Sequence, residues 1–312
     1  MGKKVLVTGG FGRVGSSAIP MLLESGYQVK VFCRHDRPEA AFRRDVEVCA
    51  GDLSDYEKIY DAAKDADIVC HLAAQFPPLF FDEAKIIESN VTGTFNLLQA
   101  MKNLDIKRLI FASTDAVYAT GASMDHYDKP LTEDMPLNPI NVYGITKVVN
   151  ETAIAKYARL FGFSYVILRF FWSMRPDEMI RLMFEARNYI SDIADEDRAG
   201  LTDDTIVELR CEDGSKYYDH ITDFRDIARS VCLAVEKENV RNEIFNIAAP
   251  DLVDYSLLSK KAADSLKRPF KTVRVKGLKN YEADISKARE MLGYVPEHHM
   301  EDMLLEAVGE KK

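Results

Sequence analysis

Three glycines near the start of the chain constrain its fold more than any other feature. Residues 3–15 read Lys-Lys-Val-Leu-Val-Thr-Gly-Gly-Phe-Gly-Arg-Val-Gly, so an apolar run leads into glycines at positions 9, 12 and 15. The run of Val and Leu suits a strand buried on both faces, and apolar residues at helical spacing follow the third glycine. Strand, glycine turn and helix in this order form the setting that a dinucleotide-binding turn requires.

Each glycine of this turn has its own physical role. Gly9 permits a tight turn, Gly12 lets the backbone approach a pyrophosphate, and Gly15 lets the helix pack close to the strand. The helix N-terminus then offers free N–H groups and a partial positive charge to phosphates. We therefore expect a dinucleotide to contact the residues of this turn: Gly9, Phe11, Gly12, Arg13, Val14 and Gly15.

Composition and charge exclude several other classes of protein. The formal net charge of −9 argues against non-specific binding to nucleic acid. The five cysteines are odd in number and form no C-x-x-C pair, which predicts reduced thiols in a cytoplasmic protein and no zinc site. No apolar run approaches the ~18 residues of a membrane span, and the first strand begins too early for a signal peptide.

Short apolar segments alternate with helical patterns through the first 170 residues. This alternation predicts an α/β fold, a doubly wound Rossmann-type parallel sheet of about seven strands with helices on both faces. The expected strands are residues 5–7, 28–33, 46–50, 67–72, 107–112, 164–170 and 243–248.

The alternation breaks after residue 170, which predicts a second region. The dinucleotide-binding domain should comprise residues 1–170 and about 221–249. Residues 171–220 and 250–312 should form a smaller substrate-binding region, with the substrate cleft between the two parts. An apolar loop at residues 76–81 either lines a substrate pocket or covers the core.

The residues after the second expected strand bear on the choice of cofactor. NAD enzymes of this architecture place an Asp or Glu about 20 residues after the glycines, to hold the ribose 2′-OH. This chain has Cys33-Arg34-His35 there. Because arginine pairs with phosphate through a fork of donors, Arg34 and Arg13 favour NADP, with NAD as the alternative. The two arginines could also be solvated surface charges.

Strand ends supply two further candidates for cofactor contacts. Asp52 follows the third expected strand, where ligands bind in an open α/β sheet, although it could equally cap the next helix. Ala73 and Ala74 follow the fourth strand, and two small side chains there would let backbone approach a cofactor.

Tyr143 and Lys147 form the expected catalytic pair. They are four residues apart on an expected helix and therefore share one face. A free phenol has a pKa near 10, and a nearby ammonium stabilises the phenolate and lowers that pKa. Thr114, at the end of a central strand, could bond the same substrate oxygen. The three residues predict a hydride-transfer site in which the tyrosine moves a proton while the nicotinamide exchanges hydride.

Motifs spread over nearly the whole chain resemble one family. The chain resembles the extended short-chain dehydrogenase/reductase family, in particular its NAD-dependent epimerase/dehydratase group. The motifs that carry this resemblance are residues 8–15, 51–53, 71–74, 90–94, 113–118 and 143–147, followed near the C-terminus by residues 281–288 and 292–296.

The resemblance implies roles for individual residues. Tyr143 is implied as the acid/base, Lys147 as its pKa-lowering and ribose-binding partner, and Thr114 as the hydroxyl at the substrate oxygen. The implied cofactor contacts are Asp52 and Leu53 at the adenine, with Leu72, Ala73, Ala74 and Asn90 also near the cofactor. The family commonly dimerises through two helices per subunit, which here are residues 83–103 and 143–161.

Two departures from the family pattern bear on the substrate. Sugar-nucleotide dehydratases show Thr-Asp-Glu where this chain has Thr114-Asp115-Ala116, so the second carboxylate for water elimination is missing. Sugar-nucleotide epimerases usually carry an arginine shortly before residues 225–228, to hold the diphosphate. This chain has an Asp about where that arginine would lie, within residues 216–220.

Three functions follow as hypotheses. The first is an NAD(P)-dependent oxidoreductase that acts on a carbonyl or hydroxyl carbon of a small molecule. The second is a sugar-nucleotide epimerase that retains NAD. The third is a non-catalytic dinucleotide sensor, which the intact Thr114, Tyr143 and Lys147 argue against, because a pure binder has no need of a tuned tyrosine.

Overall fold

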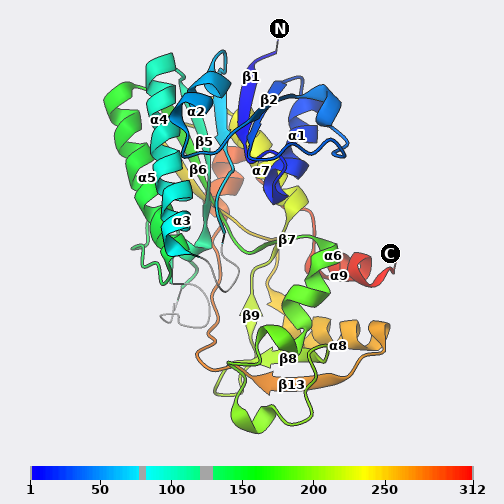
Figure 1. Ribbon diagram of the computed structural model, residues 1–312. Coiled ribbons are helices and arrows are strands. Elements are labelled where there is room, and N and C mark those ends of the chain that lie inside the picture. Colours follow the sequence, from blue (N-terminus) through cyan, green and yellow to red (C-terminus); the bar gives the residue numbers. More distant parts are fainter. Residues whose placement is uncertain (1, 77–81, 120–128, 311–312) are drawn as a thin grey trace.

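Seven parallel strands form the central sheet of the protein, in the order β11-β6-β5-β4-β1-β2-β3. The computed structural model describes residues 2–76, 82–119 and 129–310, so most of the expected apolar loop at 76–81 lies outside the described residues. The strands are β1 (Lys4–Thr8), β2 (Gln28–Cys33), β3 (Glu47–Ala50), β4 (Ile68–His71), β5 (Arg108–Thr114), β6 (Ser164–Phe170) and β11 (Glu243–Ile247). The predicted doubly wound α/β fold is confirmed (Figure 1).

Alternating side chains of each strand bury themselves on opposite faces of this sheet. In β1, Val5 and Val7 pack with one layer of helices, whereas Leu6 packs with the other. All three are fully buried, which explains why the strand is apolar throughout and not alternately polar.

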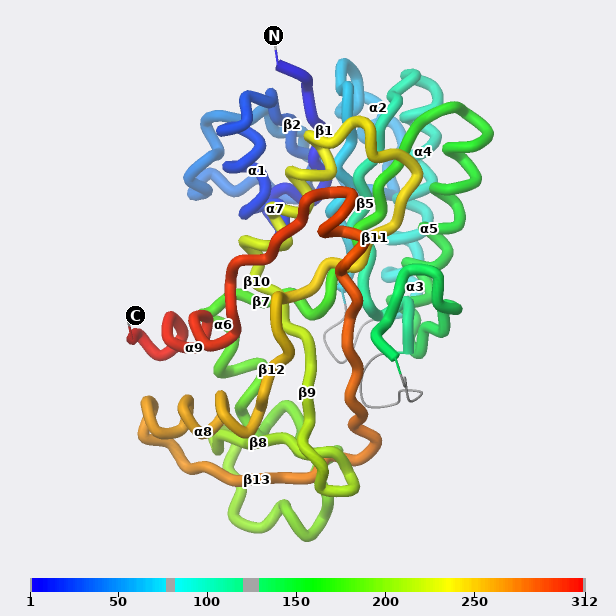
Figure 2. Tube along the Cα trace, turned by 180° about the vertical axis from the view of Figure 1, so that it is seen from behind, coloured from blue at the N-terminus to red at the C-terminus, as the bar shows by residue number. Residues whose placement is uncertain are grey.

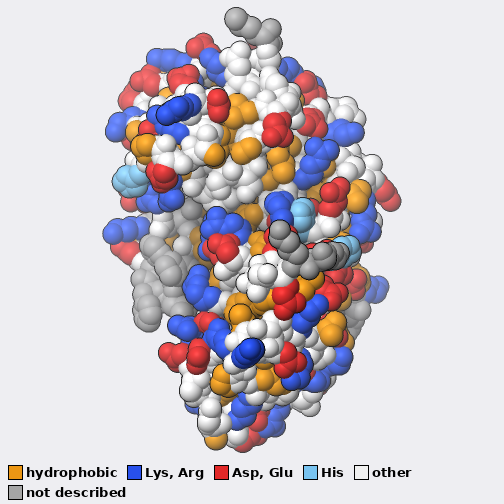
Figure 3. All heavy atoms as spheres, turned by 90° about the vertical axis from the view of Figure 1, so that its right-hand side faces the viewer, with side chains coloured by type: hydrophobic (Ala, Val, Ile, Leu, Met, Phe, Trp, Pro, Cys, Tyr) orange, Lys and Arg blue, Asp and Glu red, His pale blue; other side chains and the backbone are white. Residues whose placement is uncertain are grey.

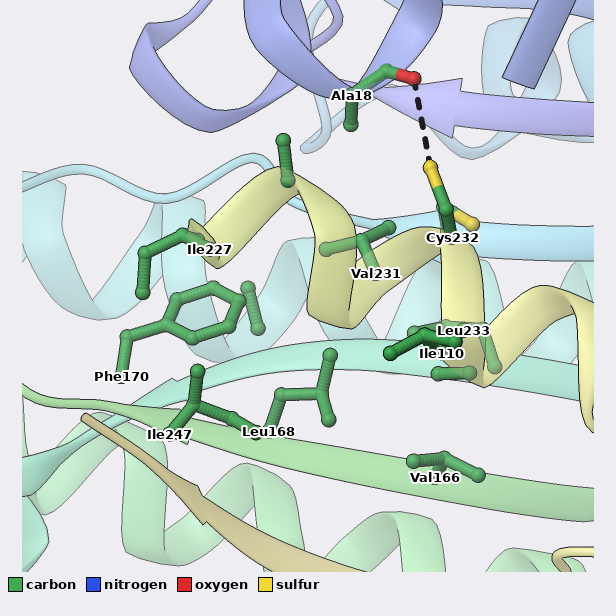
Figure 4. Packing of buried hydrophobic residues seen from close by; sticks show 14 of the residues in the cluster. Ala18, Ile110, Val166, Leu168, Phe170, Ile227, Val231, Cys232, Leu233 and Ile247 are labelled. Atoms are coloured by element: carbon green, nitrogen blue, oxygen red, sulfur yellow. Dashed lines mark hydrogen bonds between the residues drawn. The ribbon is translucent and has the colours of Figure 1, made fainter. Parts of the chain in front are cut away.

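Helices α1 (Arg13–Glu24) and α7 (Phe224–Glu236) cover one face. Figure 4 shows Ile227 and Val231 of α7 above Leu168 and Phe170 of β6. The Cys232 thiol donates a hydrogen bond to a main-chain carbonyl of α1, with 3.8 Å between the two heavy atoms. The two helices therefore form one continuous layer.

The other face is covered by α2 (Tyr56–Ala63), α4 (Gly93–Leu104) and α5 (Val142–Phe161). The helix expected over residues 83–103 consists of α3 (Glu83–Ile87), a π-helical turn η2 (Glu88–Thr92) and α4. Asn90 lies in that π-helical turn, a feature that often occurs at functional sites. The long helix α5 begins after Asn141, whose side chain accepts a hydrogen bond from the N–H of Gly144. It ends at Gly162, which has a φ of 73°.

The remaining strands and helices lie together below the central sheet in Figure 1, as Figure 2 also shows, and bury a hydrophobic cluster of their own. Its strands pair in twos: β8 (Ile206–Arg210) with β13 (Phe270–Arg274), β9 (Tyr218–Asp219) with β12 (Val253–Asp254), and β7 (Ser173–Met174) with β10 (Thr222–Asp223). Its helices are α6 (Pro176–Met179), α8 (Tyr255–Leu266) and α9 (Met300–Val308). The short helical turns of the chain are η1 (Arg43–Asp45), η3 (Asp115–Val117), η4 (Ile180–Phe184), η5 (Ala186–Asn188), η6 (Asp195–Asp197) and η7 (Ala288–Leu292). The domain boundaries given above stay a prediction.

The surface mixes charges of both signs. Figure 3 shows acidic and basic side chains interspersed over one face of the molecule. Within the described ranges, no helix is both long enough and apolar enough to cross a membrane.

Candidate active site

The glycine turn joins β1 to α1. Gly9 adopts a φ of 71°, and a Cβ atom there would lie 2.8 Å from the Cα of Ala73. Its N–H donates to the carbonyl of Phe32, and the N–H of Gly12 donates back to the carbonyl of Gly9 at 2.8 Å. Glycine is therefore required at position 9 for two reasons: the backbone has a positive φ there, and the loop after β4 approaches closely.

Gly15 also stands where a side chain cannot fit. A Cβ atom there would come within 2.6 Å of the Cα of Gly10 and of the carbonyl oxygens of Gly9 and Gly10. The sequence predicts that Gly15 lets α1 approach the strand. In the structure the close partner is the backbone of the turn itself, so the helix begins directly on top of the turn. Val14 and Phe11 are partly buried against the core, and Phe11 stacks on Phe42 with ring centroids 5.6 Å apart.

A cavity of about 380 Å³ opens beside this turn. Phe11, Gly12, Arg13, Arg37 and Arg175 are among its lining residues. Guanidinium groups and the N-terminus of α1 together make the cavity a favourable place for an anion. A dinucleotide pyrophosphate fits this donor set.

The two arginines expected to clamp a 2′-phosphate have different partners. Arg13 forms an ion pair with Glu178 of α6, with 2.8 Å between nitrogen and oxygen. Arg34 donates to the Gln75 side chain at 3.3 Å. Both arginines therefore have side-chain partners in this structure, an acidic one for Arg13 and an amide for Arg34, and the two-arginine clamp stays a prediction.

Asp52 holds a turn and does not cap the next helix. Its carboxylate accepts from both the N–H and the hydroxyl of Ser54, each at 2.9 Å, and these bonds lower the pKa of Asp52. The cap of α2 is Asp55, which accepts from the N–H of Lys58. Leu53 is buried, and its Cβ would lie 2.6 Å from a Cβ placed on Gly93.

A buried hydrogen-bonded chain links the strand ends around the turn. The Ala73 N–H donates to the Thr8 hydroxyl at 3.2 Å, and that hydroxyl lies 2.7 Å from His71 Nδ1. His71 Nε2 lies 3.1 Å from the Thr94 hydroxyl, which itself donates to the Asn90 carbonyl. The only consistent arrangement makes Thr8 a donor to Nδ1 and places the imidazole proton on Nε2. Burial lowers the pKa of His71 to about 3, so the ring is neutral.

Asn90 holds the loop after β4 in place through its amide group. It accepts from the Gln75 N–H at 2.7 Å and donates to the Gln75 carbonyl at 3.0 Å and to the Thr146 hydroxyl at 3.2 Å. These bonds fix the loop after β4, in which the Leu72 N–H donates to the Thr8 carbonyl and Ala74 is exposed. Asn90 thus orients the backbone of the loop after β4, at the proposed cofactor site. No sequence motif predicts the hydrogen-bonded chain of Thr8, His71 and Thr94.

Thr114 and Tyr143 meet at the carboxyl end of β5. The Thr114 hydroxyl donates to Asp115 at 2.9 Å, and Thr114 lies close enough to the Tyr143 phenol to lower its pKa. The Tyr143 ring also packs edge-on against Phe76, with centroids 5.2 Å apart. The structure therefore brings two of the three predicted catalytic residues close together.

Lys147 lies beneath this pair and is almost completely buried. Its ammonium donates to the Ala112 carbonyl at 2.6 Å and lies 5.7 Å from the centroid of the Tyr143 ring. Burial lowers the pKa of Lys147 to about 7, and the charge of Glu151 opposes that shift.

The direction of the Tyr143 shift differs from the sequence-based expectation. Burial raises the pKa of Tyr143 above its ordinary value, Asp115 adds to the rise, and the nearby Thr114 opposes it. The lowering expected from Lys147 is not seen, because desolvation of the phenolate outweighs the other effects. The phenol is therefore the stable form at neutral pH.

Comparison with known proteins agrees with this geometry. Residues 5–248 match the NAD dependent epimerase/dehydratase family. The chain belongs to this family.

Individual relatives match different shares of the chain. UDP-glucose 4-epimerase of Lactobacillus helveticus is 37% identical over 176 residues, which cover 54% of this chain and 51% of that protein. The chain thus matches about half the length of the first such relatives. UDP-glucose 4-epimerase of Corynebacterium glutamicum is 28% identical over 310 residues, covering 95% of this chain and 91% of that protein.

Two solved structures share the fold. A short-chain dehydrogenase/reductase superfamily protein from Agrobacterium tumefaciens, with bound NAD, is 28% identical with a TM-score of 0.86, covering 98% of this chain and 96% of that chain. UDP-glucose 4-epimerase from Brucella ovis, in complex with NAD, shares the fold at 24% identity, with a TM-score of 0.79 and coverage of 97% and 96%.

Asp219 lies within residues 216–220, the segment in which the resemblance implies an arginine for sugar-nucleotide epimerases. It is buried and accepts hydrogen bonds from the Tyr217 hydroxyl at 3.0 Å and the His220 N–H at 2.6 Å. Burial raises the pKa of Asp219 to about 6. A buried carboxylate of this kind offers nothing to a diphosphate.

Asp115 is the second buried carboxylate near the site. Burial raises its pKa to about 7, and the charge of Asp219 adds to the rise. Tyr281 lies close enough to both carboxylates for each to raise its pKa. From the sequence, Asp115 is expected only as half of an incomplete dehydratase pair. No sequence signal indicates that Asp219 and Tyr281 form a buried cluster with it.

Proposed function

We propose that this chain catalyses NAD(P)-dependent hydride transfer at a carbonyl or hydroxyl carbon of a small molecule, with Tyr143 as the acid/base. The observation that carries the proposal is that Tyr143 lies near both Thr114 and the Lys147 ammonium, whose nitrogen is 5.7 Å from the centroid of the Tyr143 ring. A purely structural tyrosine has no need of a buried ammonium on its own helix face.

The residues divide the work as follows. The raised pKa of Tyr143 keeps the phenol protonated, which is the form that donates a proton to a substrate carbonyl oxygen. Thr114 bonds the same oxygen and orients it. The charge of Lys147 stabilises the phenolate that forms when the proton leaves. A nicotinamide dinucleotide, when bound, supplies the hydride.

The residues around the glycine turn fit such a cofactor. Gly9 and Gly15 leave no room for side chains, and the cavity beside the turn is lined by Arg13, Arg37 and Arg175. We infer that Gly12 and the first N–H groups of α1 hold the pyrophosphate, with Asp52 and Leu53 near the adenine. Lys147 would additionally bond the ribose.

The identity of the cofactor turns on the residues after β2. The Agrobacterium relative has NAD bound, which supports NAD here. Arg34 supports NADP as the second candidate, because the first carboxylate after β2, Asp36, is held by Arg43 in a two-point ion pair with both distances at 2.6 Å. A carboxylate engaged in this way neither binds a ribose hydroxyl freely nor repels a 2′-phosphate.

A sugar-nucleotide epimerase is the second candidate function. Similarity to the Corynebacterium UDP-glucose 4-epimerase over nearly the full chain favours it. The burial of Asp219 argues for a different substrate contact from that of the epimerases. Tight retention of NAD through purification supports the epimerase, whereas release after each turnover supports the oxidoreductase.

We further infer a homodimer through α3–α4 and α5. Large apolar side chains lie exposed on these helices: Ile87, Phe95, Ile145, Val149, Leu160 and Phe161. Ile145 and Val149 are one turn apart and form a stripe along α5, which lies beside α3 and α4 in Figure 1.

All five cysteines are free, which supports the predicted cytoplasmic location.

The test uses the purified full chain and its Tyr143→Phe variant. We expect oxidation of NADPH or NADH with a panel of carbonyl compounds and sugars, and a loss of about 10²–10⁴-fold in kcat for the variant. Cofactor affinity should be unchanged. Cofactor binding without turnover on any substrate would favour the dinucleotide sensor instead.

A further inference from the structure

A buried ion pair lies directly behind the Tyr143–Lys147 pair. Glu151 follows Lys147 by four residues on α5, so the three side chains lie along one face of the helix. The Glu151 carboxylate accepts from Arg169 of β6 at two points, Nη2 at 2.7 Å and Nε at 3.1 Å. The exposed fractions of the two side chains are 4% and 2%.

Glu151 also binds the strand that carries Thr114. The hydroxyl of Ser113, the residue before Thr114 on β5, donates to Glu151 at 2.5 Å. The Lys147 ammonium binds the carbonyl of Ala112, one residue earlier. Two consecutive residues of β5 are therefore bonded to one face of α5, and a slip of the helix along the strand would break both contacts.

Arg169 is itself held from the opposite side. Its Nη1 donates to the Tyr118 hydroxyl at 2.6 Å and to the Glu133 carbonyl at 3.2 Å, and its guanidinium lies 5.0 Å from the centroid of the Tyr118 ring. A guanidinium bonded at all three nitrogens has one orientation. It presents the same two donors to Glu151 at all times.

We propose that Glu151, held by Arg169, is a positioning residue: it keeps the Tyr143–Lys147 face of α5 in register with Thr114 and balances the charge of the Lys147 ammonium. Buried ion pairs add little stability, because desolvation of two charges offsets their attraction. A role in orientation explains why this pair lies at the site and not elsewhere in the core. The inference rests on the proposed function only for its effect on turnover.

The electrostatic part of the proposal can be measured without any substrate. Burial alone lowers the pKa of Lys147, and Glu151 raises it. The full chain is labelled with [ε-¹³C]lysine, and the Lys147 resonance is identified as the one absent from Lys147→Arg. Its titration midpoint is then compared between the natural protein and Glu151→Gln. We expect the midpoint to fall by about one pH unit or more in the variant.

Two further variants separate positioning from folding. Because Glu151→Gln leaves the Arg169 charge unpaired, the double variant Glu151→Met with Arg169→Met keeps the volume and removes both charges. It should show a fall in the same direction but a smaller one, because the Arg169 charge is removed as well. The matched control is Arg108→Met. Arg108 is a buried arginine of β5 that donates to the carbonyls of Val240 and Lys237, at the end of the strand far from Thr114. This substitution should lower stability and leave the Lys147 midpoint in place.

The outcomes are distinct. A midpoint that stays in place in both Glu151 variants, or that moves equally in Arg108→Met, overturns the proposal. Failure of both Glu151 variants to fold overturns it too, because the pair then serves folding alone. If turnover is found, Glu151→Gln should reduce kcat about 10- to 100-fold with cofactor affinity unchanged. Absence of turnover in the natural protein would defeat the proposed function and leave the titration result standing.

Discussion

The Lys147 ammonium donates a hydrogen bond to the main-chain carbonyl of Ala112 at 2.6 Å, two residues before Thr114 on the same strand. This bond ties the helix that carries Tyr143 to the strand that carries its hydroxyl partner. It also satisfies a buried charge, which would otherwise be costly to desolvate. The arrangement of the site follows from this contact and leads to the following predictions.

Gly9→Ala should remove cofactor binding and destabilise the protein. An alanine there would combine a φ of 71° with a Cβ atom 2.8 Å from the Cα of Ala73. Strain and overpacking together should cost roughly 2–5 kcal/mol of the free energy of unfolding. Chemical denaturation followed by fluorescence measures the loss. The matched control is Gly26→Ala, where φ is 83° but no atom lies within 4 Å of the added Cβ. An equal effect of the two changes would contradict the packing argument.

Arg34→Ala should separate the two cofactors. If Arg34 binds the 2′-phosphate, the change should weaken NADP binding about 10- to 100-fold and leave NAD binding unchanged, because only NADP carries that group. Isothermal titration of the purified chain with each dinucleotide measures the effect. Arg159→Ala, an exposed arginine at the far end of α5, is the control for a general loss of positive charge. Equal affinities for the two dinucleotides that survive Arg34→Ala would leave Arg34 as a solvated surface charge.

Asp115→Asn should stabilise the protein at neutral pH and not in acid. Because folding raises the pKa of Asp115 from its ordinary 3.8 to about 7, the folded state binds more protons between these values. The natural protein then loses about 1.4 kcal/mol of stability per pH unit as pH rises through that window. Asparagine removes this loss, so the difference in stability between variant and natural protein should grow from pH 4 to pH 7 and then level off.

Melting temperatures measured across this pH range test the prediction. Asp177→Asn provides the control, because the Asp177 side chain is 74% exposed and should show no such growth. A stability difference for Asp115→Asn that does not change with pH would show that Asp115 is already ionised in the folded protein below pH 7.

Ile145→Glu should disrupt the proposed dimer. Ile145 is 48% exposed on α5, and a charge placed in a buried interface is costly to desolvate. Analytical ultracentrifugation should show a dimer for the natural chain and a monomer for the variant, with an unchanged melting transition at high dilution. Leu257→Glu on α8 is the matched control, because Leu257 is also apolar and 59% exposed but lies on a helix outside the proposed interface. A monomeric natural chain would refute the interface.

Much of the fold follows from local sequence patterns. Runs such as Val5–Leu6–Val7, with both faces apolar, predict buried parallel strands because no polar alternation is present, and all seven expected strands form the sheet. The glycine spacing likewise predicts a strand, turn and helix. The π-helical turn around Asn90 could not be predicted, since it depends on contacts with the loop after β4, 15 residues earlier in the chain.

The sheet, the glycine turn and the pairing of Tyr143 with Lys147 can be predicted from local patterns, because strand burial, turn conformation and helical spacing are local properties. The direction of the Tyr143 pKa shift and the partners of Arg13 and Glu151 depend instead on how the chain folds. Each depends on a residue far away in sequence: Arg13 and Glu178 are 165 positions apart, and Glu151 and Ser113 are 38 positions apart. Burial and charge at such a site are set by which distant segments meet there, and no local pattern encodes that.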